Sequence, residues 1–80
     1  MSEAQIAAQF AEALSAAAKA ANPAASLVSM ELSLVGESAN GEVRTRIARQ
    51  TRTLLFMEAE LLDASGVRAA AASSIHKIPA

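Results

Sequence analysis

The fold of this chain is decided by residues 42–62, EVRTRIARQTRTLLFMEAELL, where two alternating runs flank a short basic segment. Along each run apolar and polar side chains alternate, which is the period of a strand with one buried face. Antiparallel pairing about Arg52 joins arginines to glutamates: Arg44 to Glu60 and Arg46 to Glu58. The same register joins small or apolar partners on the other face: Val43 to Leu61, Thr45 to Ala59 and Ile47 to Met57. A slip of one residue would place arginines opposite apolar side chains, so this register is well specified.

Two further strands are predicted, one upstream and one downstream of this pair in the sequence. Downstream, the turn residues 63–66 lead to a strand over 67–78. Pairing that strand about Ala64 predicts two contacts: Arg68 with Glu60 and Val67 with Leu61. Upstream, residues 26–35 alternate, with one apolar face made of Val28, Met30, Leu32 and Leu34. The loop 36–41 ends in Asn40-Gly41, which is a strong turn signal.

The N-terminal segment 3–21 is expected to be a helix, because it is rich in alanine and contains no glycine or proline. Ser2 is a suitable cap, and Asn22-Pro23 ends the helix. One apolar stripe follows its three- and four-residue steps: Ile6, Phe10, Leu14, Ala17 and Ala21. Such a helix is ~28 Å long and matches strands of this length. The chain is therefore predicted to be a two-layer α+β sandwich, with one helix packed on a four-stranded antiparallel sheet.

The composition indicates that the chain associates with itself. Of its 80 residues 52% are hydrophobic, but half of these are alanine, so few large side chains are left for a core. Each large apolar side chain contributes roughly 1.5–3 kcal/mol when buried, against roughly 1.5 kcal/mol of entropy for each ordered residue. A homodimer or a higher homo-oligomer would bury more apolar surface, and we expect one.

Several classes of function are disfavoured by what the sequence lacks. A net charge of −1 and the absence of Tyr and Trp argue against nucleic-acid binding. Without cysteine there are no disulfides, thiolate zinc sites or cysteine nucleophiles. No apolar run reaches the ~20 residues of a membrane span, and the N-terminus does not resemble a signal peptide. We therefore expect a cytoplasmic protein with no membrane partner, no metal and no cofactor.

Residues 41–66 resemble the C-terminal half of the hotdog-fold acyl-CoA thioesterases. The resemblance rests on Gly-Glu-Val followed by alternation, the basic turn, Phe-Met-Glu-Ala-Glu-Leu at 56–61 and the turn that begins at Asp63. The small-residue run 69–74 is similar to the last strand of that family, and the alanine-rich helix is similar to its central helix. The chain is thus interpreted as a single truncated hotdog-like domain over 1–80. It lacks the family's leading strand, and Glu3-Ala4-Gln5 stands where family members carry a His-Gly-Gly entry to the helix.

The resemblance also bears on the strand order. A plain meander would place strand 26–35 beside strand 42–50. The family order instead places 26–35 beside the last strand, on an edge that commonly pairs with a second subunit. Strand 42–50 is then the opposite edge, and its arginines would protect that edge from aggregation. We adopt the family order.

The function implied by the resemblance is the hydrolysis of acyl-CoA thioesters at a dimer interface. Glu12 lies about where the family carries its catalytic acid, which acts as a nucleophile or as a general base on water. Arg49 and Arg52 flank the turn where such enzymes present basic residues to coenzyme A phosphates. Each of these residues also has an explanation without chemistry. Glu12 would be a solvated surface glutamate, and Arg49 and Arg52 would be arginines that keep the protein soluble. The alternative function is a catalytically silent relative that binds an acyl ligand or serves in assembly.

Other reactive residue types give weaker indications. His76 is the single histidine, and with no carboxylate or second ligand nearby it is expected to be solvated and not to bind a metal. Ser73 and Ser74 lack the Gly-x-Ser-x-Gly turn of a serine hydrolase, so serine catalysis is not expected.

Overall fold

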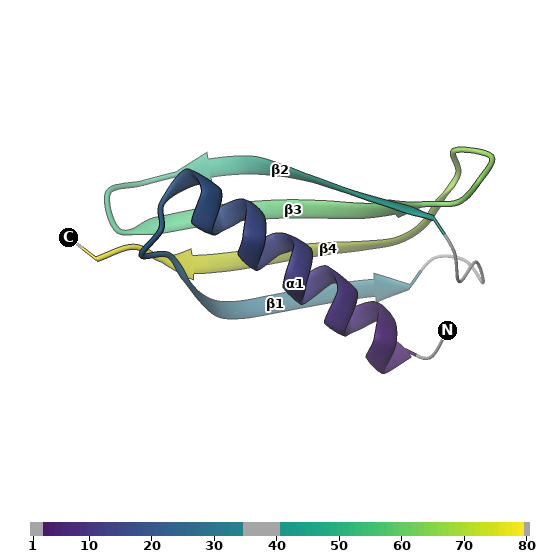
Figure 1. Cartoon of the computed structure of the whole chain (residues 1–80), viewed down its shortest axis with the longest axis horizontal. Coiled ribbons are helices and arrows are strands. Elements are labelled where there is room, and N and C mark those ends of the chain that lie inside the picture. The colour runs from purple at the N-terminus through teal and green to yellow at the C-terminus, as the bar shows by residue number, and fades with distance from the viewer. Residues whose placement is uncertain (1–2, 35–40, 80) are drawn as a thin grey trace.

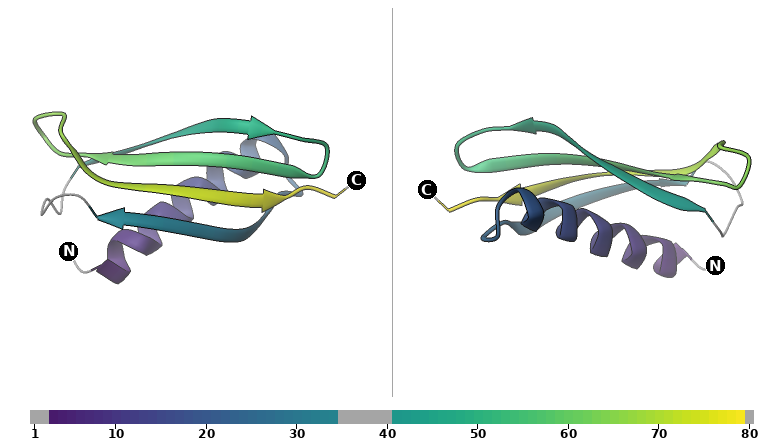
Figure 2. Two further views of the ribbon diagram at one scale, coloured as in Figure 1. Left: turned by 180° about the vertical axis from the view of Figure 1, so that it is seen from behind. Right: turned by 45° about the horizontal axis from the view of Figure 1, so that its top comes forward.

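One helix crosses one face of a four-stranded antiparallel sheet in the computed structural model, which describes residues 3–34 and 41–79 (Figure 1). The elements are α1 Glu3–Ala21, β1 Ser26–Leu34, β2 Glu42–Gln50, β3 Leu54–Leu62 and β4 Arg68–Lys77. All helical residues lie on one side of the sheet, and the other side is uncovered (Figure 2). The predicted α+β sandwich is confirmed. Ser2, Val35 and most of the loop 36–41 lie outside the described residues.

Helix α1 is fixed to the sheet by a single stripe of side chains. The buried members are Ile6, Phe10, Leu14 and Ala18. The predicted stripe ended at Ala21. In the structure Ala21 is exposed, and Ala18 is the buried residue of the last turns. The helix stops where Asn22 donates its backbone N–H to the Ala18 carbonyl at 2.8 Å. The Asn22 side chain then accepts a hydrogen bond from the Ala24 backbone at 3.0 Å and turns the chain toward β1.

The sheet has the order β1-β4-β3-β2, which confirms the order adopted from the family resemblance. Strands β1 and β2 are consecutive in the sequence but form opposite edges of the sheet (Figure 1). Buried and half-buried residues alternate along β3 and, after Ala70, along β4 as far as His76, whereas most residues of β1 and β2 are exposed. The core is therefore concentrated between α1 and the two central strands.

The register of β2 and β3 is the one that the sequence predicts. Arg44 lies opposite Glu60, Arg46 opposite Glu58, and Ile47 opposite Met57. A bulge follows, between Ile47 and Arg49, so that Arg49 lies opposite Phe56 on the outer face of the sheet, away from α1. Met57 is buried, but Ile47 on the edge strand is 46% exposed.

The predicted register of β3 and β4 is wrong. Arg68 lies opposite Leu62 rather than Glu60, and Leu61 lies opposite Ala70 rather than Val67. The turn is longer than expected because Asp63 and Val67 close it through a 2.8 Å backbone hydrogen bond. The Asp63 carboxylate holds that turn by accepting hydrogen bonds from Ser65 and Val67, which lowers the pKa of Asp63. Glu60 nevertheless reaches Arg68 diagonally, at 3.0 Å.

A bulge near the start of β4 reverses the faces of that strand. The pairing shifts by one residue between Leu61 and Leu62, and Ala69 and Ala70 are both buried. As a result His76 points into the core with 1% of its surface exposed, and the expectation that it is solvated is wrong. A similar irregularity between Leu27 and Ser29 leaves Val28 61% exposed, outside the apolar face predicted for it.

Candidate functional site

Glu12 lies in the middle of α1, on the side turned away from the sheet. Its neighbours at two residues' distance, Phe10 and Leu14, are completely buried, so the helix that carries Glu12 is firmly held. The Glu12 side chain itself is exposed. Within the described residues no ion pair or hydrogen bond engages its carboxylate. Residues 3–34 and 41–79 of a single chain therefore supply no bonded partner that would orient this carboxylate.

Arg49 and Arg52 lie at the same end of the sheet but on different surfaces. Arg49 is on the outer face of β2, opposite Phe56. Arg52 belongs to the turn between β2 and β3, whose shape depends on hydrogen bonds between Thr51 and Leu54. It lines a shallow groove of about 460 Å³, together with Asn22, Gln50, Thr51, Ile78 and Pro79. The groove brings Arg52, but not Arg49, beside the C-terminal end of α1.

The three residues selected from the sequence do not form one cluster in a single chain. Glu12 faces solvent on the helix side of the molecule, and Arg49 lies on the opposite face, with the sheet between them. A site that uses Glu12 together with Arg49 therefore needs residues from a second chain, whereas Arg52 lies beside the C-terminal end of the helix that carries Glu12.

A polar pair that the sequence did not indicate lies in the core, between β4 and α1. The hydroxyl of Ser74 is 2.8 Å from Nε2 of His76, and both residues are buried, with 3% and 1% of their surfaces exposed. Burial lowers the pKa of His76, and the nearby Lys19 ammonium lowers it further. The sequence does predict that Ser74 and His76 share a face, because residues two apart in a strand point the same way. It does not predict which face they share, because the bulge in β4 decides that.

The burial of His76 predicts that the protein loses stability in mild acid. Since the folded state holds the pKa of His76 below its ordinary value of 6.5, the unfolded chain takes up a proton first as the pH falls. We expect the urea midpoint, followed by circular dichroism, to be constant above pH 7 and to fall as the pH drops below about 6.5. The double variant Ser74→Ala/His76→Leu should lose this dependence, because both polar partners are replaced by apolar groups. An equally steep fall in the double variant would assign the effect to other groups.

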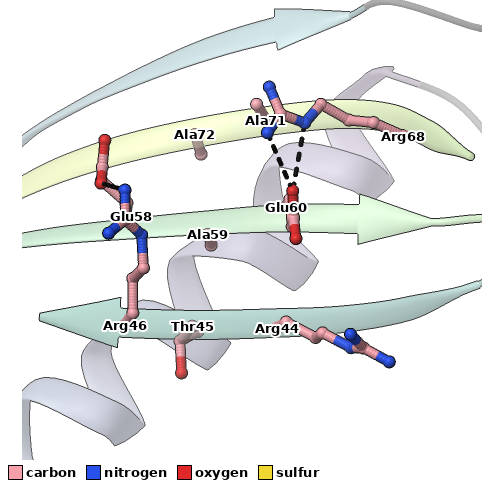
Figure 3. A pocket seen from close by; sticks show the side chains of 9 residues that line it. All are labelled: Arg44, Thr45, Arg46, Glu58, Ala59, Glu60, Arg68, Ala71 and Ala72. Carbon is pink, nitrogen blue, oxygen red and sulfur yellow. Dashed lines mark hydrogen bonds and ion pairs between the residues drawn. The ribbon is translucent and has the colours of Figure 1, made fainter.

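The outer face of the sheet carries most of the ion pairs (Figure 3). Arg46 pairs with Glu58, Arg68 with Glu60 at 3.0 Å, and Arg44 with Glu42 at 3.5 Å. All of these side chains except Glu42 border an open depression of about 370 Å³. Exposed pairs of this kind contribute about 0.2–1 kcal/mol each, so they favour the register of the strands more than they stabilise the fold. Residues 3–34 and 41–79 contain no group of three His, Asp or Glu side chains able to hold a metal ion.

Comparison with known proteins supports the fold but not a family. No family model matches the chain, and no curated protein matches its sequence. A solved structure of a protein from the thioesterase superfamily matches with a TM-score of 0.61 and 14% identity. The match covers 69% of this chain and 43% of that protein, so the chain spans less than half of its length. At this identity the likeness establishes a thioesterase-like hotdog fold.

No helix of the described residues has both the length and the hydropathy that crossing a membrane requires. The assignment of residues 1–80 to one domain and the cytoplasmic location stay predictions.

Proposed function

We propose that this chain is a thioesterase-like hotdog domain that hydrolyses acyl-CoA thioesters at the interface of a homodimer. The observation that carries the proposal is the fold, one helix on a sheet of order β1-β4-β3-β2, which superposes over 69% of the chain on a thioesterase-superfamily structure with a TM-score of 0.61. The resemblance of residues 41–66 to that family supports the same substrate class. The separation of Glu12 from Arg49 by the sheet supports an active site shared by two copies.

Strand β1 is the proposed dimer contact. It is an edge strand with exposed apolar side chains, including Leu27 at 41%, Val28 at 61% and Leu34 at 44%. Glu31 is its one charged residue, whereas β2 at the other edge carries three arginines. An unprotected edge of this kind pairs readily with another strand. Antiparallel pairing with the same strand of a second copy would extend the sheet and cover these apolar side chains.

The proposed chemistry assigns one step to each residue. Glu12 accepts a proton from a water molecule, whose oxygen attacks the thioester carbonyl carbon. The bond from that carbon to sulfur breaks, Glu12 returns its proton to the leaving sulfur, and a carboxylic acid and the thiol of coenzyme A are released. Arg52, on its groove at the end of α1, is the first candidate to hold a coenzyme A phosphate, with Arg49 as the second.

A panel of acyl-CoA thioesters tests the proposal directly. Release of free coenzyme A, followed with a thiol-reactive dye, should rise in proportion to the concentration of the protein and should distinguish chain lengths. Replacing Arg52 by alanine should raise KM, and the Arg49→Ala variant serves as the comparison. Absence of turnover across the panel would overturn the hydrolase proposal.

The dimer is tested by charges placed on the β1 edge. Wild-type protein at micromolar concentration should have the mass of a dimer by light scattering. The variant Leu27→Lys/Leu34→Lys should be monomeric, because opposed lysines cannot be buried in a shared interface. Val67, which is 60% exposed but lies outside β1, provides the matched control, and Val67→Lys should remain dimeric. A monomeric wild type would contradict the proposed interface.

A silent relative remains the second candidate, and one observation favours it. The helix begins with Glu-Ala-Gln at residues 3–5, which contain no glycine where the family often approaches the thioester carbonyl with backbone amides. Such a protein would bind an acyl-CoA without cleaving it. Saturable binding of acyl-CoA by calorimetry, with no turnover, is the result that would establish this function instead.

A further inference from the structure

We propose that the free edge of β2 is a docking site for an extended segment of a partner protein in which apolar and acidic residues alternate. This strand addition requires neither hydrolysis nor Glu12, and it uses the edge of the sheet opposite to β1. The proposal rests on the exposure of β2, on the two kinds of side chain along it, and on the charge left unpaired there.

The exposure of β2 identifies it as an open edge. The strand pairs with β3 on one side, and no described strand pairs with it on the other. Eight of its nine residues are exposed. Ile47 is 46% exposed even though it lies on the same face as Met57, which is 2% exposed. The layer between α1 and the sheet is thus left open along this strand.

The side chains of β2 present a different chemistry on each face. Toward the helix side lie Val43, Thr45 and Ile47, opposite Leu61, Ala59 and Met57. Toward the outer side lie Arg44, Arg46 and Arg49. A strand added at this edge would have its own side chains beside these two rows. Apolar residues are required beside the first row, and acidic residues are favoured beside the second.

The charges at this edge are not balanced within the described residues. Residues 42–52 contain four arginines and one glutamate. Glu58 of β3 is engaged by Arg46, and Glu60 is engaged by Arg68 of β4. Figure 3 shows Glu60 turned toward Arg68, with the Arg44 guanidinium directed away from it. Arg44 is left with a 3.5 Å contact to Glu42 on its own strand, and Arg49 has no ion-pair partner among residues 3–34 and 41–79.

The occupant that fits is a different protein rather than a second copy. Within this chain, β3 has the required alternation of apolar and acidic residues, but both of its edges are already paired. Strand β1 has a single acidic residue and is assigned to the proposed dimer. A partner strand with several acids would match the row of arginines and would add main-chain hydrogen bonds.

Labelled peptides test this inference by fluorescence anisotropy. The probe is a soluble nine-residue peptide in which valine alternates with glutamate, and its matched control carries lysine at every glutamate. We expect the acidic peptide to bind at least tenfold more tightly than the lysine peptide, with an affinity that falls as salt is added. The variant Arg44→Glu/Arg49→Glu should reverse that preference. Lys77→Glu, a charge reversal on β4, should leave it unchanged. Equal binding of both peptides by the wild type, or none, would overturn the proposal.

Two N-methylated versions of the acidic peptide distinguish strand addition from simple charge attraction. Methyl groups on alternate amide nitrogens block hydrogen bonding along one edge of the extended peptide and leave its other edge free to pair. If the peptide adds to β2, one version should bind like the parent and the other at least tenfold more weakly, whichever way the peptide runs. Equal affinity of the two versions would show that the arginines attract the peptide without a shared sheet, and would overturn the proposal.

Discussion

Replacing Phe10 by alanine is expected to lower the free energy of unfolding by about 3–5 kcal/mol. Phe10 is completely buried between α1 and the sheet, and it is one of few large side chains in the core. Loss of its ring leaves a cavity in a core whose other members are mostly small or fixed side chains. Since native proteins have total stabilities of about 5–15 kcal/mol, this loss is a large share of the total and should lower the urea midpoint strongly. Urea unfolding followed by far-ultraviolet circular dichroism measures the change, because the chain has no Trp or Tyr to report by fluorescence.

The second phenylalanine provides the control. Phe56 is half-buried on the outer face of β3, opposite Ile75 and Arg49, and α1 does not cover it. Phe56→Ala removes the same atoms from a site that is already open to water, so it should cost about 1–2 kcal/mol. Equal losses in the two variants, measured at the same protein concentration, would contradict a core located between α1 and β3–β4.

The parts of the fold that the sequence predicted are those with strong contrast between the two faces of a strand. In β2 and β3 the charged and apolar residues alternate, and an error of one residue would bury arginine. Both strands therefore have the predicted bounds, and their register is the predicted one up to the bulge after Ile47. The order of the strands, in contrast, came from the family resemblance, since the alternation alone also allowed a meander.

The register prediction failed for β4, because its two faces lack that contrast. Residues 69–72 are four consecutive alanines, and either face of such a run can be buried at similar cost. The turn that begins at Asp63 and the bulge at Ala69 then decide the face, because each changes the pairing by whole residues. His76 is buried as a consequence. The prediction that His76 is solvated took no account of the strand register, and it was therefore wrong.

The candidate site was predictable as a set of residues but not as an arrangement. Glu12, Arg49 and Arg52 are exposed, as functional residues on a surface should be, yet the sheet lies between Glu12 and Arg49. Sequence patterns place a side chain on a face of its own element. They do not show which faces of two copies meet, and in this fold the proposed site depends on that contact.

Replacing Glu12 by glutamine is expected to lower kcat/KM for acyl-CoA hydrolysis by about 10²–10⁴-fold, the usual contribution of a general base. Glutamine keeps the shape of the side chain but cannot accept the proton of the attacking water. Because Glu12 is exposed and makes no ion pair with a described residue, the fold should be unaffected. Initial rates for the best substrate of the acyl-CoA panel measure the loss, and urea unfolding checks that the stability is unchanged.

The same helix supplies a matched control for this variant. Glu3 is also exposed on α1, in its first turn, and Glu3→Gln makes the same chemical change away from the proposed reacting atoms. It should keep the wild-type rate. A non-cleavable thioether analogue of acyl-CoA should bind wild type and Glu12→Gln equally, because the proton transfer is not part of binding. If Glu12→Gln hydrolyses as fast as Glu3→Gln, the carboxylate has no role in the reaction. If Glu12→Gln instead loses affinity for the analogue, Glu12 is a binding residue and the base must be found elsewhere in the dimer.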